Sequence, residues 1–178
     1  MDTDAALELI AAQLRDDRAV LRAAVDLVPV DRRSERPAAD RWSVAEVLEH
    51  VAMVEARTAA AFGAMAATAP MRPDAATAGP TLFDRGRLLD RSTKAPAPDF
   101  ILPKGEMDFV AAWAALERAW CDVDALLTSA KGRDLSVIGR AHPFLGQLDG
   151  YQWLNSIGGH EVRHAAQIRE IADVFLGR

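Results

Sequence analysis

One stretch, YQWLNSIGGHEVRHAAQIREI at residues 151–171, decides both the fold and the candidate site. Its apolar residues recur at spacings of three and four, the pattern of a helix with one buried face. His160 and His164 belong to this series, and residues four apart share a helix face. Both imidazoles are therefore expected to face the core. An unpaired buried polar group costs about 1–3 kcal/mol, so the rings need partners, and a shared metal ion would serve both.

The composition indicates one globular domain over residues 1–178, since the chain is long enough to bury a core and half of its residues are hydrophobic. A net charge of −5 and the lack of a basic stripe argue against a nucleic-acid partner. No apolar run reaches the roughly 20 residues of a membrane span, so no membrane association is expected. The single cysteine, Cys121, indicates the reducing cytoplasm and is expected to be a small buried apolar residue.

Apolar periodicity and capping signals predict four long helices, over residues 4–28, 43–68, 108–128 and from 150 onward. Ser43 and Glu46 have the spacing of a capping box, which predicts the start of the second helix. Asp149 and Gln152 repeat that spacing before the fourth helix. Residues 129–146 are expected to form a connector that contains a turn at His142-Pro143.

The segment 69–105 holds six of the nine prolines, which forbid a long helix there. Only a short helical piece, over residues 82–90, is expected within it. So long a connection between the second and third helices predicts a crossover along the molecule rather than a tight hairpin. The sequence therefore predicts an all-α fold, a four-helix bundle with one proline-rich crossover.

Three of the four histidines lie on predicted inward faces, because His50 falls between Val47 and Val54 on the apolar side of the second helix. Neutral imidazole binds zinc, nickel, copper and iron. Two histidines from one helix and one from another would leave open positions on an ion, as in catalytic sites. The alternative is that each ring is a hydrogen-bonded core residue. His142, beside a proline in a connector, is expected to be a turn or capping residue.

Three neighbours of the histidines carry further expectations. Gly158 and Gly159 each cost a helix about 1 kcal/mol relative to Ala, which predicts that another backbone or a ligand comes close beside His160. Glu46, one turn before His50, is a candidate to orient that ring or to act as general base, although its capping role explains it better. Glu161 lies about 100° around the helix from His160 and is expected to face solvent or pair with an arginine.

Two motifs resemble those of the DinB-like superfamily, bacterial four-helix proteins associated with damage and stress. Residues 42–50, WSVAEVLEH, are similar to its W-S-x-x-x-x-x-x-H element, and residues 142–148, HPFLGQL, followed by H-x-x-R-H-x-x-Q-I at 160–168, are similar to its closing part. The resemblance implies an up-down-down-up bundle, often a homodimer. It also implies a divalent metal held by His50, His160 and His164.

The resemblance further implies an activity class. Similar proteins include metal-dependent transferases that use low-molecular-weight thiols such as bacillithiol or mycothiol, and a mycothiol-dependent maleylpyruvate isomerase. We therefore expect a thiol S-transferase or detoxifying enzyme with zinc or nickel, or else iron or manganese, and a small-molecule substrate. Two alternatives stay open: a non-catalytic, stress-associated dimeric interaction module, and a metal-dependent hydrolase with Glu46 as general base.

Overall fold

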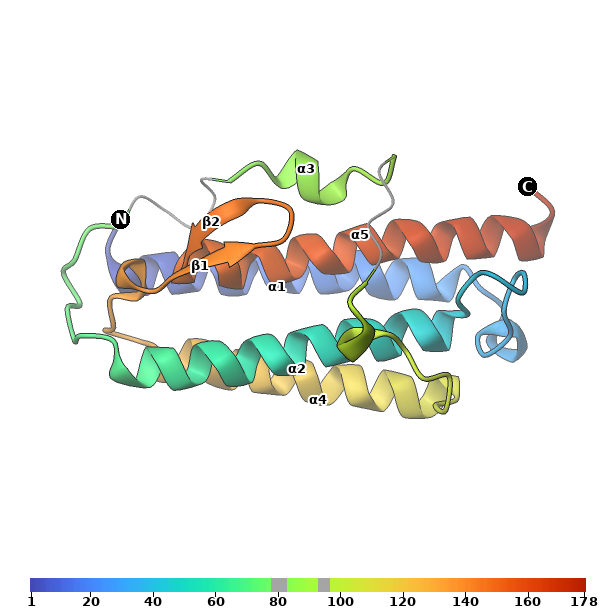
Figure 1. Cartoon of the computed structure of the whole chain (residues 1–178), viewed down its shortest axis with the longest axis horizontal. Coiled ribbons are helices and arrows are strands. Elements are labelled where there is room, and N and C mark those ends of the chain that lie inside the picture. Colours follow the sequence, from blue (N-terminus) through green and yellow to red (C-terminus); the bar gives the residue numbers. More distant parts are fainter. Residues whose placement is uncertain (78–82, 93–96) are drawn as a thin grey trace.

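The computed structural model describes residues 1–77, 83–92 and 97–178, and this part of the chain is mostly helical (Figure 1). Four long helices account for most of it: α1 Thr3–Asp26, α2 Val44–Thr68, α4 Phe109–Ser129 and α5 Gly150–Leu176. They lie within a few residues of the four predicted helices. The all-α prediction is thus confirmed in its main feature, with one small sheet as the exception.

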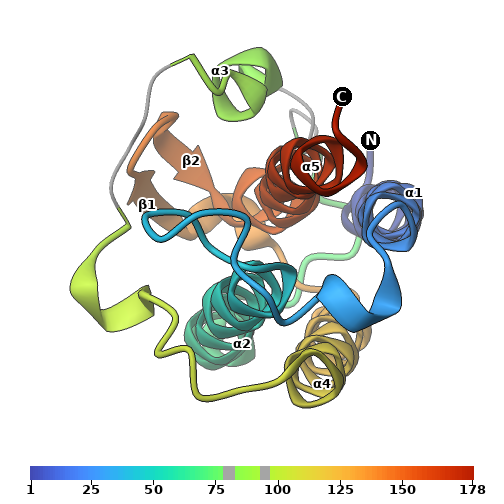
Figure 2. The same ribbon diagram turned by 90° about the vertical axis from the view of Figure 1, so that its right-hand side faces the viewer.

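The long helices lie side by side, α1 against α5 and α2 against α4, as the end-on view in Figure 2 shows. Figure 1 shows α1 and α5 running in one direction and α2 and α4 in the other. The predicted capping boxes at Ser43 and Asp149 are both present and satisfy the first backbone N–H groups of α2 and α5.

The apolar core has two parts, one toward each end of the long helices. One cluster includes Leu14 of α1 and Ile157 of α5, and the other includes Leu21 of α1 and Ala165 of α5. Between them along the helices lie several buried polar residues, among them Asp17 and Glu161. A buried polar layer therefore separates two apolar ones.

In the described part of the proline-rich crossover the secondary-structure elements are short. They are the helix α3 Arg85–Leu89 and the 3₁₀ helix η2 Asp99–Ile101; two further 3₁₀ turns, η1 Val30–Arg32 and η3 Leu135–Val137, lie in other connections. The predicted helical piece over 82–90 is thus found as α3, while Leu82 itself lies outside the described residues. Figure 1 shows α3 lying over α5.

The connector predicted over residues 129–146 is found, with a turn that follows His142, but it also contains strands that were not predicted. It holds most of an antiparallel hairpin, β1 Gly139–His142 paired with β2 Gly146–Asp149. Gly146 adopts a φ of +76°, a value that suits a residue without a side chain at the turn. The indole of Trp153 donates to the carbonyl of Arg140 at 3.0 Å and ties the hairpin to α5. Strands of four residues are too short for a clear alternating pattern.

Two further observations concern the surface. Cys121 is exposed, so the expectation of a buried apolar residue was wrong: Trp120 takes the inward position on α4, and the next residue points about 100° away. Within the described ranges, none of the helices has the length and apolar character needed to cross a lipid bilayer.

Candidate metal centre

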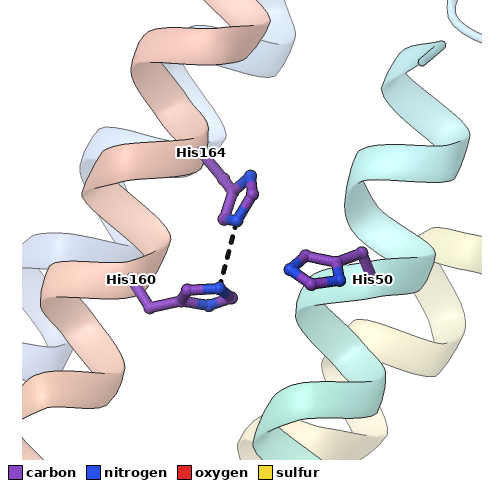
Figure 3. A group of neighbouring side chains, drawn as sticks. All are labelled: His50, His160 and His164. Carbon is purple, nitrogen blue, oxygen red and sulfur yellow. Dashed lines mark hydrogen bonds between the residues drawn. The ribbon is translucent and has the colours of Figure 1, made fainter. Parts of the chain in front are cut away.

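The three histidines predicted to meet do lie together, between α2 and α5 (Figure 3). The ring centroid of His50 lies 5.2 Å from that of His160 and 4.8 Å from that of His164. One ring nitrogen from each residue can be chosen so that all lie within 4.8 Å of one another. Among the described residues this is the one group of three or more histidine, cysteine or carboxylate side chains so arranged.

The outer nitrogens of two rings are held by hydrogen-bond acceptors. Nδ1 of His50 lies 2.8 Å from the carbonyl oxygen of Ile101. A carbonyl can only accept, so Nδ1 carries the hydrogen and Nε2 of the neutral ring keeps a free lone pair. Nδ1 of His164 likewise lies 2.9 Å from Oε1 of Gln167. Such outer bonds fix ring orientation and tautomer in metal sites.

The third ring completes the arrangement. Nε2 of His160 lies 3.1 Å from Nε2 of His164, and donates to it if His164 is protonated at Nδ1. Two nitrogens bound to one tetrahedral zinc at 2.0–2.1 Å would be separated by about 3.3 Å. Nδ1 of His160 is buried and has no hydrogen-bond partner among the described residues. The donor set therefore fits a metal that binds nitrogen, and it leaves one buried nitrogen unsatisfied as it stands.

Burial keeps all three rings neutral near pH 7. It lowers the pKa of His160 to about 3, with smaller contributions from the charges of His50, His142 and Arg163. Burial also lowers the pKa of His164 well below its usual value, and that of His50, where the bond to the Ile101 carbonyl opposes it. Neutral imidazole is the form that binds metals.

The surroundings of His160 explain the two helical glycines, though not as expected. A Cβ on Gly158 would lie 2.1 Å from Oδ2 of Asp17, and one on Gly159 would lie 2.6 Å from Cδ2 of Leu88. Close approach was correctly predicted. The approaching groups are side chains of α1 and α3 rather than a backbone or a ligand.

Glu46 is engaged elsewhere and does not orient His50. Its carboxylate accepts from the backbone N–H of Ser43 at 2.8 Å and from the guanidinium of Arg36 at 2.9 Å. Burial opposes ionisation, but these hydrogen bonds outweigh it and hold the pKa of Glu46 below its usual value. The group that orients His50 is the Ile101 carbonyl, which sequence patterns do not reveal because it is a backbone atom from a distant segment.

Glu161 was wrongly expected to face solvent; the alternative, an arginine partner, is found. Its side chain is fully buried, accepts from Nε1 of Trp120 at 2.6 Å, and lies 3.9 Å from Nε of Arg18. Glu55 of α2 is also fully buried; in the described part of the chain no amide, hydroxyl or cationic donor reaches its oxygens, and the carboxyl of Glu161 can bond to it only when one of the two acids carries a proton. We call Asp17, Arg18, Glu55, Trp120 and Glu161 the carboxylate cluster. Burial raises the pKa of Glu161 to about 7 and that of Glu55 well above its usual value.

His142 is the last residue of β1 rather than a residue of the turn, and its side chain caps the turn that follows, so only the capping half of the expectation is met. Its Nδ1 accepts from the backbone N–H of Phe144 at 3.2 Å, and its ring packs on Trp153 with centroids 4.7 Å apart. Burial lowers its pKa to about 4. It is not a member of the three-nitrogen group.

Comparison with known proteins places this chain in a family. It is similar to the uncharacterized protein YuaE of Bacillus subtilis (strain 168), with 27% identity over 147 residues, which are 80% of this chain and 85% of that protein. No solved structure gives a significant match. The profile of the DinB superfamily matches residues 13–168, which include all three histidines. The chain therefore belongs to the DinB superfamily.

Proposed function

We propose that this protein binds one divalent metal ion through His50, His160 and His164, within an up-down-down-up four-helix bundle. One observation carries the proposal: three neutral rings from two helices bring one nitrogen each within 4.8 Å of one another. Zinc or nickel suits a set of imidazoles best, and iron or manganese would follow. Membership of a superfamily whose members bind metals supports the same conclusion.

We further propose that the site serves thiol transfer to a small substrate, in the cytoplasm and as a homodimer. A bound ion would supply Lewis acidity that keeps a thiol in its nucleophilic thiolate form. The chain contributes three ligands and would leave the other coordination positions of the ion open. The lowered pKa values of the rings keep protons off the ligand nitrogens. Solvent reaches the site at the partly exposed His160. Glu46, engaged by Ser43 and Arg36, gives the hydrolase alternative no general base.

A non-catalytic interaction module is the second candidate, because a surface hollow lies away from the histidines. It measures about 710 Å³, is mostly apolar, and lies between α2 and α4. Met53, Ala56 and Ala115 are among its lining residues, and none of the three histidines is. A partner bound there, with no change in the metal site, would favour this function.

The deciding experiment is elemental analysis of protein purified without chelator. We expect close to one divalent ion per chain in the native protein, followed by binding of a low-molecular-weight thiol to the metal-loaded form. Metal-free protein of equal stability would contradict the metal site. Stoichiometric metal without any thiol binding would contradict only the transferase.

A further inference from the structure

A short part of the crossover, residues 97–105, runs along the N-terminal half of α2, and we call it the strap. The carbonyl of Ile101 in this strap accepts from Nδ1 of His50 at 2.8 Å. Four residues farther on, the strap is attached to the same helix a second time. The backbone N–H groups of Lys104 and Gly105 donate to the two carboxylate oxygens of Glu49, at 3.0 and 3.2 Å.

Two prolines limit the backbone freedom of the strap, and one of them, Pro103, lies between the two attachments. Pro98 and Pro103 restrict the backbone on either side of η2, and Ile101 is the last residue of that 3₁₀ turn. Gly105 adopts a φ of +70°, and a Cβ there would lie 3.1 Å from Oε1 of Glu46, so the strap ends in close contact with α2. A segment with this limited freedom, held at Lys104 and Gly105, determines where the Ile101 carbonyl lies.

Glu49 is well suited to anchor the strap. Its side chain is 4% exposed, and both of its oxygens bind strap N–H groups. It precedes His50 directly and so points about 100° away from it around α2, which places it outside the group of ligand nitrogens. The hydrogen bonds of Glu49 are therefore connected to the ring through the strap.

We propose that Glu49 is a positioning residue for the metal site: by anchoring the strap it keeps the Ile101 carbonyl on Nδ1 of His50, so that Nε2 faces the other two rings. The inference rests on the proposed metal function, but its first consequence concerns the metal-free protein. Without the anchor the carbonyl moves, and the proton of His50 is free to occupy either nitrogen. Removing the hydrogen-bond partner of a metal-bound histidine typically weakens metal binding about 10- to 100-fold, and an indirect partner belongs at the lower end.

The test compares Glu49→Ala and the milder Glu49→Gln with Asp4→Asn. Asp4 is a matched control because its carboxylate also accepts a distant backbone N–H, that of Gly132 at 2.7 Å, but at another place in the fold. The first readout is the tautomer of His50 in metal-free protein labelled with ¹⁵N-histidine, where only four rings give signals. The second is the Kd for Zn²⁺ alone, measured by competition with a chelator.

We expect a single Nδ1–H tautomer for His50 in the wild type and in Asp4→Asn, and a mixture in Glu49→Ala. The Kd for Zn²⁺ is expected to rise about tenfold in Glu49→Ala and less in Glu49→Gln. An unchanged tautomer and an unchanged Kd in Glu49→Ala would overturn the inference. If Zn²⁺ does not bind to the wild type, the proposed metal function fails, and the tautomer alone then decides the role of Glu49.

Discussion

The histidine group and the carboxylate cluster are both polar groups inside the helical core that draw residues from α2 and α5, and the cluster adds residues of α1 and α4, yet they are arranged in opposite ways. In the first, Ile101 and Gln167 hold outer nitrogens, so that inner nitrogens face one another beside the partly exposed His160. In the second, Glu55 and Glu161 are fully buried and have more acceptor atoms than donors. Burial of polar side chains is therefore not enough to form a metal site. Oriented, neutral donors can receive a cation, whereas the carboxyl pair keeps a proton of its own.

The largest effect is expected at the histidines. His164→Ala removes a ligand and the acceptor of the His160 hydrogen bond. Metal affinity should therefore fall by more than about 100-fold, which is more than the loss expected when only the hydrogen-bond partner of a ligand histidine is removed. Metal content by elemental analysis measures it. His142→Ala is the control, because its ring lies outside the three-nitrogen group and should leave metal content unchanged. Equal loss in both variants would mean that the ring at 164 is not a ligand.

The next effect concerns the carboxylate cluster and not the metal. Arg18→Met removes a buried guanidinium that lies 2.8 Å from Asp124 and 3.9 Å from Glu161. Asp124 is largely exposed, so its pair with Arg18 is weakened by solvent, whereas Glu161 is buried and loses a partner; a buried polar group left unpaired costs about 1–3 kcal/mol, so the free energy of unfolding in urea should fall by about 1–2 kcal/mol. Metal content should remain that of the wild type. A loss of metal in Arg18→Met would show that the two groups are coupled.

The dependence of stability on pH should further distinguish the histidine group from the carboxylate cluster. The pKa of His160 is lowered to about 3, while that of an unfolded histidine is about 6.5, so the unfolded chain takes up a proton first. The metal-free protein should therefore lose stability as the pH falls from about 6.5 toward 3. Urea titrations over this range should show a shallower decline in His160→Ala. The same slope in both proteins would contradict a neutral buried ring.

The smallest effect is expected for Glu55→Gln. The pKa of Glu55 is raised well above that of the unfolded chain, so the unfolded chain loses this proton first and the protein loses stability as the pH rises above about 4.5. Glutamine resembles the protonated acid, and the change at pH 7 should stay within about 1 kcal/mol. Glutamine has no such proton to lose, so the variant should become the more stable protein as the pH rises. Thermal unfolding at pH 6 and pH 9 measures the crossover, and a large loss at both values would mean that Glu55 is ionised in the fold.

Local patterns explain what could be predicted from the sequence. The helices follow from apolar periodicity and from caps such as Ser43, and the meeting of His50 with His160 and His164 follows because each lies on an apolar face. The prediction for Glu161 failed because α5 packs against both α1 and α2, so this helix has more than one buried face. The single apolar stripe read from the sequence identifies only one of those faces.

Backbone groups from distant segments account for the rest. The Ile101 carbonyl on His50 and the strap N–H groups on Glu49 join residues more than 50 positions apart, and neither has a side-chain signature. The β1–β2 hairpin depends on its packing against α5 through Trp153 and has no strong pattern of its own. These contacts decide which nitrogen of a ring is free, which is the property that matters for metal binding.

X-ray absorption spectroscopy of the zinc-loaded protein tests the central claim most directly. The arrangement of His50, His160 and His164 predicts scattering from three imidazole rings bound through nitrogen at about 2.0–2.1 Å, and from two in His50→Ala. A ligand shell of oxygens, or an unchanged number of imidazoles in His50→Ala, would contradict it.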